Sequence, residues 1–477
     1  MSIANSEFTM LLRTNLRRLP DCVITQIFDS VPFDHLMEFC KHYPDKYVRD
    51  LLIQYYYCSR VQFAFNPPVP PPKATPGRRN LVTFVDSAVS QFMEDFPEVI
   101  PKTLLIDVCM DFKEAREILD KFHDRLVKCE VIDFALLEAE ISADDFQFLL
   151  SFPNIKRVYF HFNSKLLLPA LIDNPKLIKH PTLEHIIFCE HEITDWSGVR
   201  FPQNLKTLNL SYHRINFSTL ILPQSVHSLS FIYCQIYSIK ALRRQMTNEL
   251  TELKITDNML EHIVIDDLPR KLHTMDLRRN SIFSITGKEW PKGLKSLILS
   301  HNALDDDSLK VINNGVGWPE QLITLDLSVN FFDHTENLSN LPQSLKRLEI
   351  SSNTFLWRDQ ENRVEFPVNL TYLGMSDCRV HNLSLLKFPV SLKELQLAHN
   401  GIKDLLPYGD WTELINLRQL DLFDNSITTL DNWIPPPNLR ELIVENNPIT
   451  RSPQFNELRN TFKFKITGMK SESNQQV

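Results

Sequence analysis

Hydrophobic residues recur in one fixed pattern over more than half of the chain. The phrase L-x-x-L-x-L-x-x-N-x-I starts twelve times between Leu183 and Ile449, at intervals of 21 to 28 residues. Its L-x-L centre alternates apolar and polar positions, which is the period of a strand with one buried face. Each repeat is therefore predicted to supply one short strand. The phrase begins at Leu183, Leu205, Val226, Leu250, Leu272, Leu294, Leu322, Leu345, Leu370, Leu392, Leu417 and Leu439.

This phrase and its period resemble the leucine-rich repeat, whose repeats span roughly 20–29 residues. Parallel stacking of such strands pairs their backbone groups and buries the leucines in one continuous core. The expected fold class is α/β, a leucine-rich repeat solenoid with a parallel β-sheet arc and short convex segments. Most repeats leave only roughly eleven residues for the convex side, which favours extended or single-turn structure. The 28-residue interval is the exception, since residues 306–312 are predicted to begin a helix.

Two polar signatures mark the turns of each repeat. Eight repeats carry Asn at the ninth position of the phrase, while Cys234, Cys378, His191 and His213 occupy the other four. A short polar side chain there is expected to bond to the turning backbone of its own and the neighbouring repeat. In nine repeats a proline lies three residues before the first leucine. Its fixed φ is expected to turn the chain back into the strand.

The chain is predicted to divide into a small head and a long array. Residues 1–60 form a helical domain, residues 61–80 a proline-rich linker, and residues 81–180 irregular opening repeats mixed with helices. Residues 181–466 form the solenoid with a C-terminal cap, and residues 467–477 a flexible tail. In the head, one helical stripe contains Val23, Ile24, Ile27, Phe28 and Val31. One interpretation is that the linker holds two working ends apart; the other is that the head is a cap on the first repeats.

The head resembles an F-box, whose L-P-x-x-ϕ-ϕ-x-x-I-F-x-x-ϕ-P-x-x-x-L outline runs here from Leu19 to Leu36. The family's cysteine and tryptophan motif in the third helix is missing, with only Cys40 and Tyr47 near its place. An F-box followed by leucine-rich repeats is similar to the substrate receptors of SCF ubiquitin ligases. The resemblance implies that the head binds the Skp adaptor, and through it the cullin ligase core, while the repeats bind a target protein. The implied adaptor contacts are Leu19, Pro20, Ile24, Ile27, Phe28 and Leu36.

Two other classes of protein share the repeat phrase. The first is a leucine-rich repeat scaffold without an F-box, for example one that serves a phosphatase or a small GTPase. The second is the bacterial effector ubiquitin ligase, which it also resembles. Those ligases carry a catalytic cysteine domain after the repeats, whereas no cysteine follows Ile449 here. The scaffold is therefore the alternative that remains open.

Bulk properties narrow the function further. The net charge is −8 with no concentration of basic residues, which argues against nucleic acid as the main partner, and the 10 glycines form no phosphate-binding loop. The sequence shows no signal peptide and no membrane span. Eight cysteines without paired spacing favour a reduced compartment, the cytoplasm or the nucleus. We expect no catalytic site, no cofactor and no metal.

The target is expected on the concave face of the predicted sheet. Side chains at the fifth, seventh and eighth positions of the phrase point away from the leucine core. Aromatic and arginine residues gather there in the first half of the array, and such residues are typical interface anchors. For any single residue, a solvated sheet face is the plain alternative. The predicted target-binding residues are Tyr212, Tyr233, Arg278, Arg279 and His301.

Overall fold

The structure is a computed structural model that describes most of the chain. The described residues are 20, 24, 28, 39–40, 42, 46–58, 60–67, 82–161, 167–189, 195–243, 246–357, 363–452, 455 and 465–467. They fall into two compact units, Met1–Val226 and His227–Val477. Each unit contains its own part of the repeat array, and each is described by itself. No helix in the described ranges has the length and apolar character needed to span a membrane.

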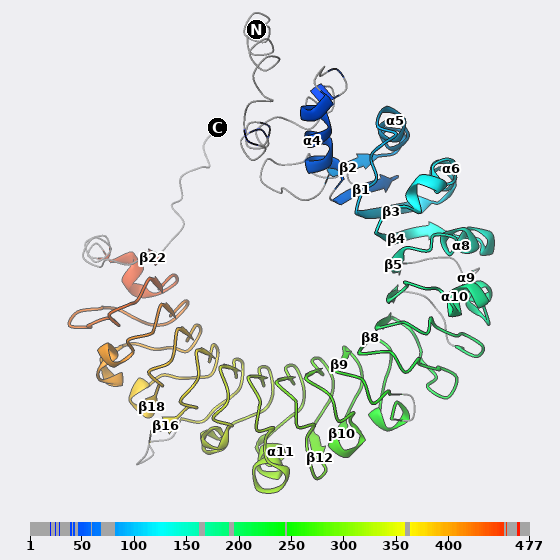
Figure 1. Ribbon diagram of the computed structural model, residues 1–477. Coiled ribbons are helices and arrows are strands. Elements are labelled where there is room, and N and C mark those ends of the chain that lie inside the picture. The colour runs from blue at the N-terminus through cyan, green and yellow to red at the C-terminus, as the bar shows by residue number, and fades with distance from the viewer. Residues whose placement is uncertain are drawn as a thin grey trace, which may run out of the picture. The chain divides into compact units, whose positions relative to one another are not determined.

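The first unit contains a parallel sheet with the strand order β2-β1-β3-β4-β5-β6-β7. Every pairing is parallel, so consecutive strands need a crossover segment between them. Figure 1 shows α5, α6 and α8 together on one side of these strands. The strands are β1 (Arg60–Phe65), β2 (Val82–Val85), β3 (Thr103–Asp111), β4 (Val131–Glu140), β5 (Ile155–His161), β6 (His185–Cys189) and β7 (Thr207–Ser211).

The repeats before Leu183 have helices between their strands, as predicted for residues 81–180, and their register shifts between Cys109 and Asp111 and between Ile132 and Asp133. Core residue Leu104 aligns with Ile132, 28 residues later, and Val158 aligns with Ile186, again 28 residues later. Intervals of this length leave room for helices, whereas the 22-residue repeats do not. The helices are α5 (Ser87–Asp95), α6 (Lys113–Lys121), α7 (His123–Leu126), α8 (Ala143–Leu149), α9 (Leu167–Leu171) and α10 (Pro175–Ile178).

The head leads directly into the sheet. Helix α4 (Lys46–Tyr57) buries Val48 and Leu52, and β1 begins at Arg60. The backbone N–H of Lys102 donates to the carbonyl of Cys58 at 2.8 Å, which fixes this junction to the start of β3. The predicted linker at 61–80 is therefore wrong at its N-terminal boundary: residues 61–65 lie in β1, and the proline-rich stretch connects β1 to β2. A tether between the head and the repeats is excluded, because β1 already belongs to the sheet.

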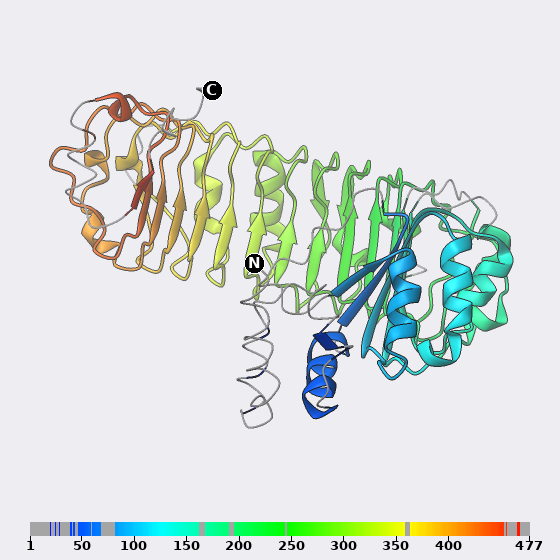
Figure 2. The ribbon, with the colours of Figure 1, turned by 90° about the horizontal axis from the view of Figure 1, so that it is seen from above.

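Among its described residues the second unit has eleven parallel strands: ten follow the phrase, and the last lies beyond the final copy, which starts at Leu439. The fourth position of each repeat aligns across the sheet, so that Leu253, Met275 and Leu297 lie side by side and fully buried. Figure 2 shows these short strands in parallel succession. The strands, in spatial order, are β8 (Ser228–Ile232), β9 (Glu252–Thr256), β11 (Thr274–Asp276), β13 (Ser296–Ile298), β14 (Thr324–Asp326), β15 (Arg347–Glu349), β17 (Tyr372–Gly374), β19 (Glu394–Gln396), β20 (Gln419–Asp421), β21 (Glu441–Ile443) and β22 (Lys465–Thr467).

The other layer of the second unit is built from short segments, as the repeat length predicts. It contains the strand pairs β10 (His262–Val264) with β12 (Ser284–Thr286), and β16 (Val364–Glu365) with β18 (Leu386–Lys387). The α-helix predicted in the 28-residue interval is α11 (Asp306–Val311), capped by Asp305 and Ser308 and followed by a π-helical turn at Ile312–Val316. Single 3-10 turns complete the layer at Ile239–Ala241, Ile265–Asp267, Thr335–Asn340, Leu383–Leu385, Leu406–Tyr408, Trp411–Glu413 and Pro448–Arg451.

The predicted asparagine bonds are present and link neighbouring repeats. The amide nitrogen of Asn302 donates to the carbonyls of Leu299 at 3.0 Å and of Leu277, one repeat earlier, at 3.1 Å. Its side-chain oxygen accepts the backbone N–H of Ile282 at 3.0 Å. Asn258, Asn330, Asn353, Asn400, Asn425 and Asn447 form equivalent bonds. This series, called the asparagine ladder below, satisfies backbone groups that the turn would otherwise bury without partners.

The proline turn before the strand is also regular. In all nine repeats with the proline, its carbonyl accepts the backbone N–H of the first residue of the phrase, at 3.0 to 3.4 Å. Leu294 donates to Pro291 at 3.0 Å, for example, and Leu392 donates to Pro389 at 3.0 Å. The proline thus closes a tight turn and needs no donor of its own.

Loss of one rung of the asparagine ladder should destabilise the second unit. Asn302→Ala leaves the Ile282 N–H and the Leu277 and Leu299 carbonyls buried without this partner, so we expect a loss of about 3 kcal/mol. The measurement is the urea midpoint of the unfolding transition. Asn416→Ala is the matched control, because exposed Asn416 makes one bond, to the Val390 carbonyl, and should cost less than about 1 kcal/mol. Equal losses of stability in the two variants would contradict the proposed contribution of the asparagine ladder.

Candidate protein-binding face

The open face of the second unit's sheet, opposite the leucine core, carries the fifth, seventh and eighth positions of the phrase. Over strands β8 to β14 these positions enclose a shallow cavity of about 450 Å³. Its walls combine cations, carboxylates and hydroxyls from five adjacent strands. The lining residues are Ile232, Lys254, Thr256, Asp257, Arg278, Arg279, Ser300, His301, Asp326 and Ser328. Three of the five predicted target-binding residues, Arg278, Arg279 and His301, therefore lie together.

Arg278 is held in one orientation by the carboxylate of Asp276. Its Nε lies 2.9 and 3.0 Å from the two carboxylate oxygens, and Nη2 lies 2.8 Å from Oδ2. These hydrogen bonds raise the pKa of Arg278 above its ordinary value. Asp276 is only 7% exposed, whereas the guanidinium side chain remains 44% exposed. Arg278 is thus a pre-oriented cation that still has donor groups available to a ligand.

Residues at the eighth position adopt an unusual backbone conformation. Arg279 and His301 have φ angles of 54° and 53°, in the left-handed region that non-glycine residues rarely occupy. The amide of Arg279 donates to the Ser300 carbonyl at 3.0 Å, and that of His301 to the Ser328 carbonyl at 2.9 Å. These bonds to the next repeat hold the conformation against a cost of about 1–2 kcal/mol per residue. As a result, the backbone of both residues is fixed at the edge of the cavity. Nη1 of Arg279 lies 3.8 Å from Oδ1 of Asp257.

The two predicted tyrosines are exposed but do not line the cavity. Tyr233 is 46% exposed with φ of 54°, at the eighth position of the repeat that contains β8. Tyr212 is 48% exposed with φ of 65°, and it belongs to the first unit. Both occupy the same place in their repeats as Arg279. Tyr233 adds apolar area beside the cavity wall formed by Ile232, while Tyr212 is assigned only to its own unit.

The sequence did not single out the carboxylates that organise this cavity. Asp257 stands at the eighth position of the repeat that starts at Leu250, but it is not one of the five predicted target-binding residues. Asp276 stands at the fifth position of its repeat, and its ion pair with Arg278 depends on the side-chain rotamers of both residues. A comparison of charges at the fifth and seventh positions within each repeat would have indicated this pairing.

The predicted adaptor-binding residues are only partly described. Ile24 is fully buried and Phe28 is 3% exposed, and the Phe28 ring packs on Phe39 with ring centroids 4.8 Å apart. These two side chains stabilise the interior of the head, so they lack the exposed surface that a direct adaptor contact needs. Pro20 is exposed, and its carbonyl accepts the Ile24 N–H at 3.1 Å. Leu19, Ile27 and Leu36 lie outside the described residues.

The thiols at the turn positions are structural. Cys378 donates from Sγ to the Ile350 carbonyl at 3.2 Å, and its backbone N–H donates to Asn400 Oδ1 at 2.9 Å. Burial raises the pKa of the Cys378 thiol to about 12. A nucleophilic thiolate at neutral pH is therefore disfavoured. Within the described residues, no cysteine takes part in a disulfide.

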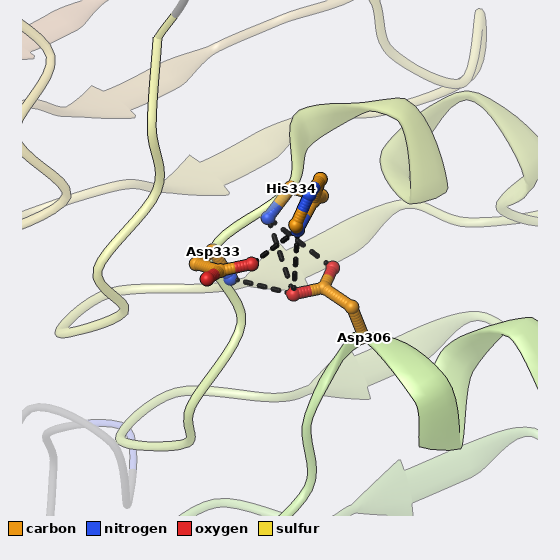
Figure 3. Close-up of side chains that lie close together, drawn as sticks. All are labelled: Asp306, Asp333 and His334. Carbon is orange, nitrogen blue, oxygen red and sulfur yellow. Dashed lines mark hydrogen bonds and ion pairs between the residues drawn. The ribbon is translucent and has the colours of Figure 1, made fainter.

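One cluster offers atoms of the kind that bind metals, and the sequence did not indicate it. Figure 3 shows Asp306, Asp333 and His334 pointing toward one another at the start of α11. Their potential ligand atoms lie within 4.8 Å of one another. However, Asp306 is only 7% exposed and already accepts the backbone N–H groups of Asp333 at 2.8 Å and His334 at 3.2 Å. The cluster joins the loop at 333–334 to the adjacent repeat, and this accounts for its geometry without an ion.

The aligned strands, the short second layer and the buried asparagines together define a leucine-rich repeat solenoid. The chain is a leucine-rich repeat protein, and known proteins share this architecture. Toll-like receptor 2 type-2 of Gallus gallus is 31% identical over 160 residues, which cover 33% of this chain and 19% of that protein. Podocan of Mus musculus is 23% identical over 308 residues, or 63% of this chain and 45% of that protein.

The solved structures give the same result at the level of the fold. The structure of the Toll–Spatzle complex of Drosophila aligns over 86% of this chain and 56% of its own chain, with 18% identity and a TM-score of 0.51. No protein-family model matches the chain. The chain spans less than half the length of the two curated relatives above.

The His334 cluster predicts a stability that depends on pH. Hydrogen bonds to Asp333 and then to Asp306 raise the pKa of His334 above its ordinary value. Its contribution is fully present below the unfolded-state pKa, about 6.5, and is lost as the pH rises through the higher folded-state pKa. We expect the melting temperature of the wild type to exceed that of His334→Gln most near about pH 5.5 and least near about pH 9.

His381→Gln is the matched control for this measurement. The His381 ring contacts the backbone carbonyl of Arg379 at 3.0 Å, and no carboxylate within the described residues pairs with it. Its effect on the melting temperature should not decrease from low to high pH. A His334 difference that stays constant over the same range would contradict the assignment.

Proposed function

We propose that the protein is a binding scaffold that holds a protein target on the open face of its second unit. The observation that carries this proposal is the cavity around Arg278. There, a carboxylate orients a cation that is still 44% exposed, beside the more exposed Arg279. A pre-oriented arginine pays little conformational entropy on binding, and arginine is enriched among residues that dominate binding energy. The target site is then this cavity, with Tyr233 as an aromatic neighbour.

The distribution of charge around the cavity supports a protein target. Lys254, Arg278 and Arg279 are accompanied by Asp257, Asp276 and Asp326, so the cations and carboxylates balance. A surface with closely spaced cations and carboxylates favours a partner that presents hydrogen-bonding groups of both charges, as a folded protein does. The Toll–Spatzle complex illustrates that a solenoid of this fold is compatible with a protein ligand.

Charge reversal at the cavity should abolish target capture. We would purify the tagged full chain from cell extract and quantify co-purifying proteins by mass spectrometry, for the wild type, Arg279→Glu and Lys310→Glu. Arg279 is 58% and Lys310 53% exposed, but Lys310 lies on α11 in the other layer. We expect at least one protein whose recovery falls about tenfold or more in Arg279→Glu and is unchanged in Lys310→Glu. Identical recovery profiles for these two variants would rule out the cavity as the target site.

We further propose that the chain is the substrate receptor of an SCF-type ubiquitin ligase, with the Skp adaptor and the cullin core bound through the head. The observation that favours this role is the F-box outline from Leu19 to Leu36, followed by helix α4. Helix α4 joins β1 without a tether, and this argues against a connector whose two ends are held apart. A receptor of this kind would act in the cytoplasm or the nucleus.

Adaptor binding separates the receptor from a scaffold without an F-box. We would mix the purified full chain with purified Skp adaptor and measure complex formation by size exclusion. The expected result is a complex that is lost in Leu19→Ala/Pro20→Ala and retained in Lys310→Glu. Absence of a complex with the wild-type chain would leave the scaffold as the function, with the head as a cap of the first unit.

A further inference from the structure

One column of the second unit differs in charge from the rest of the chain. Ten residues each stand immediately before a strand of the sheet, at the second position of the phrase. They include five Lys or Arg residues, two His residues and no carboxylate, in a chain whose net charge is −8. We call this set the leading column: His227, Thr251, His273, Lys295, Ile323, Lys346, Thr371, Lys393, Arg418 and Arg440.

The backbone fixes the leading column in register. The N–H of each member donates to the carbonyl of the preceding member, at 2.8 to 2.9 Å, without interruption from Thr251 to Arg440. Neighbouring members are therefore about 4.8 Å apart, the spacing of strands in a sheet. Separate surface lysines would be dispersed by chance, but here the repeat geometry forces these cations into one row.

The cations of this row have no counter-ions in the part of the chain that the structure describes. Lys295, Lys346, Lys393, Arg418 and Arg440 are all exposed. Other cations of the same unit form ion pairs, such as Lys465 with Glu441 at 2.6 Å and Lys387 with Glu365 at 2.8 Å. None of the ion pairs among the described residues includes the five cations of the column. Their charge is therefore directed to solvent or to a partner.

An aliphatic row runs beside the C-terminal part of the column. Val368, Val390 and Ile415 stand three residues before Thr371, Lys393 and Arg418, and they are 66%, 49% and 51% exposed. The next repeat holds the backbone of each: the carbonyls of these residues accept from Ser391 at 2.7 Å, Asn416 at 3.0 Å and Asn438 at 2.8 Å. In earlier repeats the same position carries Arg270, Lys292, Glu320 and Gln343. Exposed aliphatic side chains at this position therefore begin with Val368, and the last rung, at Arg440, has Pro437 there.

We propose that the leading column and the aliphatic row form a docking surface for an acidic, amphipathic helix of a partner protein. A helix that lies along the rows advances about 5.4 Å per turn, close to the spacing of about 4.8 Å between rungs. Its apolar stripe packs on Val368, Val390 and Ile415, while carboxylates on the flank of that stripe meet Lys393 and Arg418. The surface is separate from the cavity at Arg278, which opens on the face of the sheet.

The composition of the two rows disfavours other anionic partners. The leading column contains no tyrosine, phenylalanine or tryptophan on which a nucleic-acid base could stack, although single-stranded binding depends on such residues. A lipid surface is usually met by a broad basic face with aromatic residues at the interface. Here the cations and the aliphatic side chains form two narrow parallel rows, and this is the pattern of a helix that presents one stripe of each kind.

The test uses the full chain and a synthetic peptide. The probe is a fluorescein-labelled helix of about 18 residues, or about five turns, with Leu at successive i, i+3 and i+4 positions and Glu on both flanks. A peptide of the same composition with the Leu positions scrambled is the matched control. Binding is followed by fluorescence anisotropy at about 0.1 M salt, where exposed charges still interact over about 10 Å.

Three variants assign the site. Lys393→Glu/Arg418→Glu removes the charge and should raise the peptide Kd about tenfold or more. Val390→Ser/Ile415→Ser removes the apolar contact and should raise the Kd about fivefold. Lys288→Glu/Lys310→Glu makes the same charge change outside the column and should leave the Kd within about twofold. All these positions are exposed, so circular dichroism should show an unchanged fold. Arg279→Glu should also leave the peptide Kd unchanged, which keeps this surface distinguishable from the target cavity.

Three results would overturn the proposal. The first is no binding of the helical peptide, or equal binding of the scrambled peptide. The second is an unchanged Kd in Lys393→Glu/Arg418→Glu. The third is tighter binding of a single-stranded RNA of the same length, or of phosphatidylserine vesicles, with the same dependence on Lys393 and Arg418; in that case the column serves a different class of partner.

Discussion

The asparagine ladder is the constraint on which the second unit depends. A strand of three residues makes few backbone bonds, and the turn after it would bury carbonyl and N–H groups without partners. Asn302 supplies three of these bonds at once and joins its own repeat to the previous one. Because an unpaired buried polar group costs more than a formed bond returns, the position tolerates only residues that can replace the amide. Cys378 does so through its thiol and the oxygen of Asn400.

Because of this constraint, side chains at the same phrase position of successive repeats form columns across the sheet. Each repeat adds one rung, so residues at one phrase position become neighbours about 4.8 Å apart. The eighth position is held in the left-handed region, as at Arg279 and His301, and its side chains project at the end of the strand. The second position collects cations, while the fifth, seventh and eighth positions carry most carboxylates of the sheet. The charge of the molecule is therefore segregated by phrase position, although the whole chain carries only −8.

The junction between α4 and the sheet changes the interpretation of the head. Helix α4 ends at Tyr57, β1 begins at Arg60, and β1 pairs with β2 and β3. The close junction of α4 with the first strand is compatible with a cap and with a receptor. Ile24 and Phe28 contribute to its interior. In the sequence, the proline-rich stretch lies between β1 and β2 and not between the head and the sheet.

The sequence by itself determined the fold class, the register of the second unit, the asparagine and proline turns, and the helix in the 28-residue interval. Period and side-chain chemistry are local, and the same local solution is repeated along the chain. Only the tertiary structure decided that β1 lies before the proline-rich stretch, that Asp276 clamps Arg278, and that Ile24 and Phe28 are buried. Each of these depends on contacts between residues distant in sequence or on one rotamer among several, which no repeat pattern encodes. The leading column lies between the two cases: its residues can be read from the phrase, but only the parallel register makes them one surface.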